Sequence, residues 1–207
     1  MNTKQHWENV FANKKMNDVS WYETKPIISL QFLKDYKIAK TAAIIDIGGG
    51  DSFFVDNLLA LGYKNITVLD ISEVALNKAK ARLAKKAKKI KWIVADAANF
   101  KPTEQYDFWH DRAAFHFLTL ENEIENYITT IKQNITASGV LVIGTFSDKG
   151  PKKCSGIDVK QYNETTMPDR LKKYFNKIKC ITINHLTPFN TLQNFIFCSF
   201  KKLETSF

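Results

Sequence analysis

An apolar run that ends in three consecutive glycines constrains this chain more than any other feature. Residues 43–47 read Ala-Ile-Ile-Asp-Ile, with Asp46 as the acidic residue, and Gly48, Gly49 and Gly50 follow directly. A short β-branched run of this kind is typical of a buried parallel strand, and a helical pattern follows it. Glycine has no Cβ, so ligand atoms approach its backbone closely and positive φ costs little. The pattern therefore predicts a nucleotide-type ligand at a strand–turn–helix unit.

The turn fits a dinucleotide poorly. A dinucleotide loop reads G-x-G-x-x-G, but Phe53 stands where the third glycine would be. Asp46 and Asp51 add negative charge around a turn that would need to attract pyrophosphate. Asp51 is explained equally well as a helix cap. The charge pattern favours a cationic or zwitterionic ligand, and S-adenosylmethionine carries both a sulfonium and an ammonium group.

Two later strands also end in acidic residues. Residues 66–70 end in Asp70, about 20 residues beyond the turn, the spacing at which a carboxylate accepts ribose hydroxyls. Residues 90–95 form the next apolar run, and Asp96 and Ala97 follow it. The carboxyl ends of parallel strands meet at one edge of a sheet, so we expect these acids to face one ligand. Each acid taken alone is also a good helix cap.

These residues resemble the class I S-adenosylmethionine-dependent methyltransferases, roughly from Trp7 to the C-terminus. The resemblance implies S-adenosyl-L-methionine as cofactor and S-adenosyl-L-homocysteine as its product. Ser52 departs from the family, in which many members keep a third glycine. Trp21 and Tyr22 are read either as core residues or as a lid over the sulfonium. The cofactor-binding residues that we expect are Trp21, Tyr22, Asp46, Gly48, Gly49, Gly50, Asp70, Ile71, Asp96, Ala97 and His110.

The order of predicted elements indicates an α/β fold. Helices are expected near residues 3–12, 26–36, 51–61, 73–88, 121–135 and 167–175, and strands near 43–48, 66–70, 90–95, 106–110, 139–146, 178–184 and 194–200. Strands that alternate with helices predict a parallel sheet with helices on both faces. No helix separates the last two strands, so we expect one strand to be antiparallel. The resemblance implies a single Rossmann-like doubly wound sheet of seven strands, order 3-2-1-4-5-7-6, with strand 7 antiparallel. We expect one domain over residues 1–207, with a helical cap at 1–40 and the core at 41–207.

The segment after the fourth strand is the densest in functional groups, and a turn near residue 185 is expected at the same edge. Simpler interpretations stand beside each catalytic one: an ion pair between Asp111 and Arg112, a backbone hydrogen bond for His110, a half-buried imidazole for His116 and a hairpin cap for His185. The candidate catalytic residues are His110, Asp111, Arg112, His116 and His185.

Three motifs resemble a small bacterial methyltransferase subgroup: D-R-A-x-F-H-F-L after strand four, G-P-x-x-C-S-G after strand five, and H-x-T-P in the last hairpin. The chain lacks the N-P-P-Y or D-P-P-Y run with which amide and adenine-N6 methyltransferases bind a planar amine. The tryptophan-containing N-terminal segment and the Asp-Arg pair are loosely similar to thiopurine-type thiol methyltransferases. The resemblance therefore makes a thiol or another soft nucleophile one candidate acceptor.

Composition limits the partners. The chain has 207 residues, 44% of them hydrophobic, and a formal charge of +9. Seven basic residues lie between Lys78 and Lys89, but lysine dominates and no aromatic residue interleaves them, which favours a solvated helix face over a nucleic-acid surface. No apolar run reaches membrane length and no signal segment is recognised. Three cysteines without a C-x-x-C pair predict a reduced, cytoplasmic protein without structural zinc.

Three functions remain open at this point. The first is a methyltransferase for a small-molecule acceptor, acting by direct in-line transfer as a monomer or homodimer. The second is a protein lysine methyltransferase, and the third is a non-catalytic cofactor- or RNA-binding module. Alignment of the reactants contributes most to methyl transfer, so a thiol acceptor needs only orientation. An amine or hydroxyl acceptor needs a base such as His116, His110 or His185.

Overall fold

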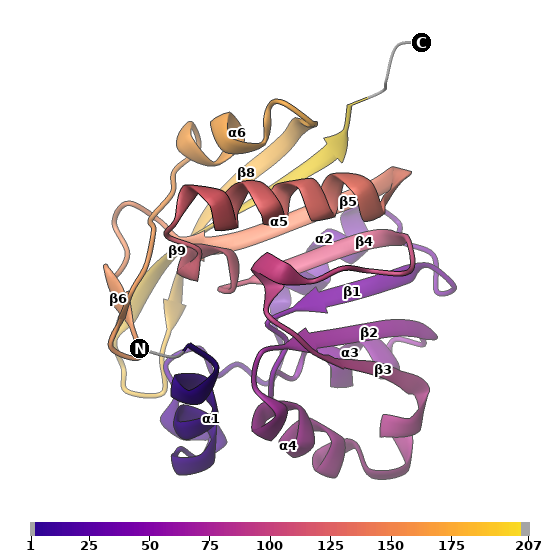
Figure 1. The fold of residues 1–207 in the computed structure, drawn as a ribbon. Coiled ribbons are helices and arrows are strands. Elements are labelled where there is room, and N and C mark those ends of the chain that lie inside the picture. The colour runs from indigo at the N-terminus through magenta and orange to yellow at the C-terminus, as the bar shows by residue number, and fades with distance from the viewer. Residues whose placement is uncertain (1–2, 204–207) are drawn as a thin grey trace.

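The computed structural model describes residues 3–203 and arranges them around one seven-stranded sheet (Figure 1). The order of the strands is β3-β2-β1-β4-β5-β9-β8, and β9 runs antiparallel to both neighbours. This confirms the predicted order, with β8 and β9 as the sixth and seventh strands of the sheet. The strands are β1 (Ala43–Ile47), β2 (Asn65–Asp70), β3 (Ile90–Val94), β4 (Tyr106–Arg112), β5 (Ile135–Phe146), β8 (Phe175–Leu186) and β9 (Leu192–Lys202).

Helices cover both faces of the sheet, and the first helix lies at the carboxyl ends of the strands (Figure 1). One face packs against α2 (Ile27–Asp35), α3 (Phe54–Ala60) and α4 (Glu73–Leu83). The opposite face packs against α5 (Glu121–Asn134) and α6 (Thr166–Leu171). The remaining elements are α1 (Thr3–Asn13), the short 3-10 helices η1 (Met16–Asp18), η2 (Ala84–Lys89), η3 (Ala97–Asn99) and η4 (Phe115–Phe117), and the hairpin strands β6 (Lys153–Cys154) and β7 (Ile157–Asp158).

Side chains that point alternately to the two faces of the central strands divide the core into two layers. In β4, Phe108 faces the α2–α4 layer while the next residue, Trp109, faces the α5 layer. In β1, Ile44 and Ile45 divide in the same way. Successive side chains of a strand point to opposite faces, so the same rule decides which polar residues at the strand ends meet each other.

Several boundaries differ from the sequence prediction. Helix α3 begins at Phe54 rather than at residue 51, because the turn continues through Ser52. Helix α4 ends at Leu83, where Ala84 adopts a φ of 49°, and η2 continues the chain to β3. The β6–β7 hairpin was not predicted, because two-residue strands carry no periodic signal.

The prediction of fully reduced cysteines is wrong in this structure. Cys180 of β8 and Cys198 of β9 lie directly opposite each other and form a disulfide, with a Cα–Cα distance of 4.1 Å. The two residues are 18 positions apart in sequence, so spacing alone did not reveal them. Antiparallel pairing of the last two strands brings them together. Cys154 is free and buried.

Candidate functional site

A cavity of about 180 Å³ opens at the carboxyl ends of the central strands. Its floor is the glycine turn after β1 together with the ends of β2 and β4, and the segments after β3 and η4 form its walls. The N-terminal segment and β9 contribute the remaining sides. Its charged and polar lining residues include Ser20, Ser29, Asp46, Asp51, Asp70, Asp96, His110, Arg112, Glu123 and Gln193.

The glycine turn leaves no room for side chains. Gly48 and Gly50 have φ values of +63° and +43°, which larger residues rarely adopt. A Cβ at Gly49 would lie 2.5 Å from the Asp46 carboxylate, and one at Gly50 would lie 2.9 Å from Asp70 Oδ2. The turn therefore forms a cradle of bare backbone against two acidic side chains.

Asp70 is the last residue of β2 and faces this cradle. Its Oδ1 accepts a hydrogen bond from the Ser72 backbone N–H at 2.8 Å. The N-cap of α4 is Ser72, whose hydroxyl oxygen accepts from the Ala75 N–H at 3.1 Å. Burial raises the pKa of Asp70 to about 7. Within residues 3–203 no cation pairs with this buried carboxylate, an environment that hydroxyl donors from a ribose would relieve.

Asp96 and Ala97 also line the cavity, on the segment that follows β3. Asp96 Oδ1 accepts from the Ala98 N–H at 3.0 Å, and its Oδ2 accepts from Asn99 Nδ2 at 3.0 Å. Asp96 is therefore the cap of η3 and a cavity residue at once. Ile71, predicted beside Asp70, lines the cavity as well.

A buried chain of three side chains joins β1, β4 and α2 at the base of the cavity. Asp46 Oδ1 lies 2.7 Å from His110 Nδ1, and His110 Nε2 lies 2.8 Å from the Ser29 hydroxyl oxygen. All three residues are buried and line the cavity. His110 thus bonds to side chains rather than to backbone, and both of its ring nitrogens are engaged.

Asp111 and Arg112 point to opposite faces of the sheet, so the interpretation as a mutual ion pair is wrong. Asp111 accepts two backbone N–H groups of the following turn, at 3.0 and 3.1 Å, and the Tyr127 hydroxyl at 2.6 Å. Burial raises the pKa of Asp111 to about 6. Arg112 lines the cavity and pairs with Glu23 of the N-terminal segment, with an N–O distance of 3.1 Å.

The structure places His116 and His185 behind the cavity wall. His116 is fully buried rather than half-buried, and its Nδ1 accepts the Phe146 N–H at 3.2 Å. Burial lowers the pKa of His116 to about 3. His185 Nε2 donates to the Ser20 carbonyl at 2.8 Å, and burial together with nearby Arg112 lowers its pKa. Of the five candidate catalytic residues, His110 and Arg112 therefore reach the cavity, whereas Asp111, His116 and His185 do not.

An aromatic roof closes the cavity over the glycine turn. Trp7 contacts Phe117 and Trp21 edge-on, with ring centroids 5.0 and 6.0 Å apart, and Phe11 lies 6.1 Å from Trp21. All four line the cavity. Tyr22, predicted as a cofactor residue, turns away from it toward the ring of Phe53, 6.0 Å distant.

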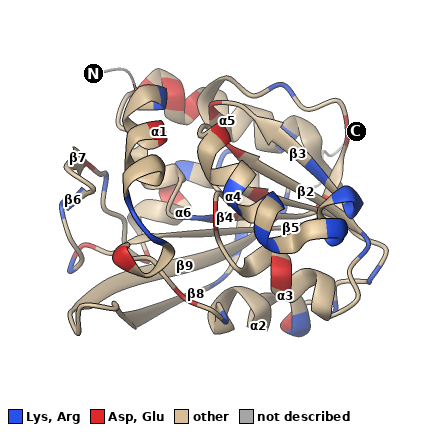
Figure 2. Cartoon of the chain, turned by 90° about the horizontal axis from the view of Figure 1, so that it is seen from below, with Lys and Arg blue, Asp and Glu red and all other residues tan. Residues whose placement is uncertain are grey.

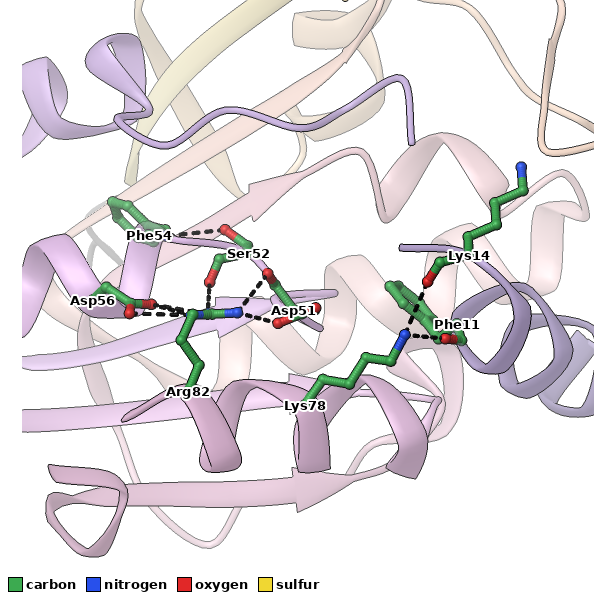
Figure 3. A network of polar contacts seen from close by, with 8 residues as sticks. All are labelled: Phe11, Lys14, Asp51, Ser52, Phe54, Asp56, Lys78 and Arg82. Carbon is green, nitrogen blue, oxygen red and sulfur yellow. Dashed lines mark hydrogen bonds and ion pairs between the residues drawn. The ribbon is translucent and has the colours of Figure 1, made fainter. Parts of the chain in front are cut away.

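The basic run between Lys78 and Lys89 lies on α4 and η2, where Figure 2 shows Lys and Arg in blue. It is only partly a solvated face. Lys78 Nζ donates to the carbonyl oxygens of Phe11 and Lys14, which binds the end of α1 to α4 (Figure 3). Arg82 donates to the side chains of Asp51 and Asp56 and to the backbone behind the glycine turn (Figure 3). Asp51 therefore holds Arg82 and does not cap α3.

Sequence reasoning missed Ser29, Trp7, Phe11, Phe117 and Gln193 as cavity residues. Ser29 is a single serine in an otherwise apolar stretch of α2, which is a weak but readable signal. The aromatic residues are indistinguishable from core residues until the tertiary packing is known. Among residues 3–203, no group of three His, Cys, Asp or Glu side chains is placed to hold a metal ion. No helix in the same range is long and apolar enough to span a membrane.

Comparisons with known proteins agree with this geometry. Residues 44–139 match a family model described as a methyltransferase domain. The EEF1A lysine methyltransferase 2 of Danio rerio is 25% identical in an alignment 160 positions long that covers 69% of this chain and 68% of that protein. The chain is thus similar to a curated methyltransferase over more than half of its length.

Solved structures share the fold at lower identity. The N-methyltransferase NodS from Bradyrhizobium japonicum with S-adenosyl-l-homocysteine is 17% identical, with a TM-score of 0.70 over 99% of this chain and 100% of that chain. A structure described as the conversion of a disulfide bond into a thioacetal group during echinomycin biosynthesis is also 17% identical, with a TM-score of 0.78 over 99% of this chain and 94% of that chain.

Sheet order, glycine cradle and matched domain together define an S-adenosylmethionine-dependent methyltransferase with the class I fold. The residues fit the cofactor. The cradle is free of Cβ atoms, and the buried Asp70 carboxylate beside it has room for hydroxyl donors.

Proposed function

We propose that this enzyme methylates a small-molecule acceptor, with a thiol or another soft nucleophile preferred. The observation that carries the proposal is the roof over the cavity. Trp7, Phe11 and Trp21 come from the chain's own N-terminal segment, and Cys154 of the β6–β7 hairpin lines another side. An acceptor must fit beneath these side chains together with the cofactor, which favours a compact molecule over a protein surface.

The expected cofactor residues divide the work of holding the adenosyl group. Asp70 would accept the ribose hydroxyls, the segment of Asp96 and Ala97 would lie along the adenine, and the glycine turn would receive the methionine part. When bound, S-adenosylmethionine supplies a methyl carbon that bonds to the acceptor's lone pair, while the carbon–sulfur bond breaks and its electron pair stays on the sulfur of S-adenosylhomocysteine. Fixing the reactants in line contributes on the order of 7–11 kcal/mol to such a step.

The state of the histidines favours a soft nucleophile. His110 is hydrogen-bonded through both ring nitrogens, to Asp46 and to Ser29, so an acceptor's proton would reach it only through the Ser29 hydroxyl or after that contact breaks. His116 lies outside the cavity. A thiol has an ordinary pKa of about 8.5 and loses its proton to water far more readily than an alcohol does. Orientation by the cavity is then sufficient for a thiol.

A protein lysine acceptor is the second candidate, and the similarity to EEF1A lysine methyltransferase 2 is the observation that favours it. That similarity amounts to 25% identity over 69% of this chain. A lysine acceptor would need a path to the cavity past the aromatic roof and a group that accepts the ammonium proton.

A screen with methyl-labelled S-adenosylmethionine tests the proposal. Thiols, phenols and amines would be offered in parallel with proteins of a cell extract. We expect label in small thiols and none in protein, and Asp70→Asn, which should bind the cofactor weakly, serves as the negative control. Label confined to protein bands would overturn the small-molecule assignment.

A further inference from the structure

The cavity carries charges of both signs. The acidic side chains of Asp46, Asp51, Asp70 and Asp96 line the part around the glycine turn and the ends of β2 and β3, where the cationic cofactor is expected. Within residues 3–203, Arg112 at the end of β4 is the only lysine or arginine that lines the cavity. Beside Arg112 stand Phe195 and Gln193 of β9, on the opposite side of the sheet order from β2 and β3. A cavity rich in carboxylates thus also presents one guanidinium, on the side toward β9.

Arg112 makes far fewer hydrogen bonds than Arg82 does. Arg82 makes hydrogen bonds through all three of its nitrogen atoms to Asp51, Ser52 and Asp56. Arg112, with a side chain 13% exposed, meets Glu23 at 3.1 Å and lies 5.9 Å from the ring centre of Phe195. A guanidinium offers five N–H donors in a fork that matches a carboxylate. Its geometry therefore leaves donors for a ligand.

Gln193 adds an unpaired polar atom on the side of the cavity toward β9. Its Oε1 is buried and accepts no hydrogen bond from any residue between 3 and 203. Buried polar atoms in folded proteins nearly always have a partner, so this oxygen indicates a place for an N–H, O–H or S–H donor of the ligand, apart from its anionic group. The aromatic rings of Phe146 and Phe195 surround these polar groups with apolar surface.

We propose that Arg112 binds an anionic group of the methyl acceptor, which makes the acceptor a small organic acid with an apolar body. This inference rests on the proposed small-molecule function and specifies its substrate class. Glu23 occupies the guanidinium when no acceptor is bound, and its side chain, 29% exposed, has access to solvent when the acceptor's acid replaces it. Arg112 acts on specificity, while the carboxylates and the glycine turn hold the cofactor.

Matched pairs of acceptors test the inference. 4-Mercaptobenzoate, 3-mercaptopropionate, 4-hydroxybenzoate and 4-aminobenzoate would each be compared with the corresponding amide, using labelled S-adenosylmethionine. We expect kcat/KM for at least one acid to exceed that of its amide by tenfold or more. A second readout needs no turnover: benzoate should bind the protein loaded with S-adenosylhomocysteine more tightly than benzamide does, by calorimetry.

Two variants test whether Arg112 causes the preference for acids over amides. Arg112→Met should abolish the acid preference in both assays, while its affinity for S-adenosylhomocysteine alone stays within threefold of the wild type. Arg170→Met is the matched control, because Arg170 pairs with Glu121 on the surface and does not line the cavity. It should keep the preference.

Each other outcome has its own meaning. Equal use of acids and amides by the wild type, no binding of any acid, or a preference that survives Arg112→Met would overturn the inference. Loss of S-adenosylhomocysteine affinity in Arg112→Met would assign the guanidinium to the cofactor instead. Small neutral acceptors would leave the proposed function standing without this inference, whereas label found only in protein would refute the proposed function itself. If Arg112→Met fails to fold, the wild-type comparison of acids and amides decides.

Discussion

The Ser72 hydroxyl donates to Glu8 Oε2 at 2.8 Å, and this contact joins the first helix of the chain to the start of α4. Glu8 also accepts the backbone N–H groups of Glu73 and Val74, at 2.9 and 3.0 Å. A carboxylate from α1 thus sits at the positive end of the α4 dipole. Because Ser72 N–H in turn bonds to Asp70, the roof of the cavity is tied to the expected ribose carboxylate.

Breaking this tie should speed the release of product. We expect Glu8→Ala to raise the dissociation rate of S-adenosylhomocysteine about tenfold, because a lost helix-cap interaction costs about 1 kcal/mol or more and the roof of Trp7 and Phe11 loses its anchor. Stopped-flow tryptophan fluorescence would follow the release, since Trp7 and Trp21 line the cavity.

A second contact between α1 and α4 is made by Lys78, which donates to the Phe11 and Lys14 carbonyls. Lys78→Met removes this donor and, like Glu8→Ala, should raise the dissociation rate of S-adenosylhomocysteine. Lys86→Met is the matched control. Lys86 is an exposed residue of η2 and should leave the rate unchanged. Equal release rates in all three variants and the wild type would show that α1 does not hold the cofactor.

Cofactor affinity should depend on pH through Asp70. Its pKa is raised to about 7 by burial, and ribose hydroxyls bond best to the ionised form. Binding therefore releases a proton below pH 7, so affinity should fall up to tenfold per pH unit on the acidic side and level off above pH 7. Calorimetry in buffers of different ionisation enthalpy measures that proton directly.

Asp70→Asn tests the same assignment. The variant should bind S-adenosylhomocysteine more weakly by about 1.5–3 kcal/mol, the range for hydrogen bonds to a charged group, and the dependence on pH should disappear. A variant with wild-type affinity and an unchanged pH profile would reduce Asp70 to a structural residue of the α4 start.

The cofactor side of the fold was predictable because its signals are local. Glycines that follow a β-branched run, and acids that end successive strands, determine both the sheet edge and the charge of the site from short segments of sequence. The structure therefore places Gly48, Asp70 and Asp96 around one cavity, as the spacing indicated.

The surroundings of the residues predicted as catalytic were harder to predict because their contacts are long-range. Asp111 and Arg112 are neighbours in sequence, yet successive side chains of β4 point to opposite faces of the sheet. Asp111 therefore contacts Tyr127, whereas Arg112 contacts Glu23. His185 meets Ser20 across 165 positions, a contact that no sequence pattern reveals. Gln193 becomes a cavity residue only when β9 inserts antiparallel between β5 and β8.

Arg82 should be a determinant of stability rather than of nucleic-acid binding. Its side chain is 17% exposed and clamps the segment after the glycine turn through Asp51 and Asp56. Arg82→Met would leave Asp51 buried without its cation, at a cost of about 2–4 kcal/mol for a half-buried pair. Urea unfolding measures the loss, and Arg170→Met at the surface should cost less than about 1 kcal/mol. Addition of Asp51→Asn should recover part of the loss, and a double variant as unstable as the sum of both changes would contradict the clamp.

His116 should affect stability and its pH dependence more than turnover. Burial lowers its pKa to about 3 in the folded protein, below the ordinary value of 6.5, so the unfolded chain binds more protons between these two values. Its contribution to stability is therefore complete above pH 6.5 and falls by up to about 1.4 kcal/mol per unit as the pH drops toward 3. His116→Gln should flatten that slope in urea titrations and, because His116 does not line the cavity, should leave the turnover rate within about threefold of the wild type. If a folded His116→Gln protein instead turned over about a hundredfold more slowly than the wild type, this imidazole would be the catalytic base.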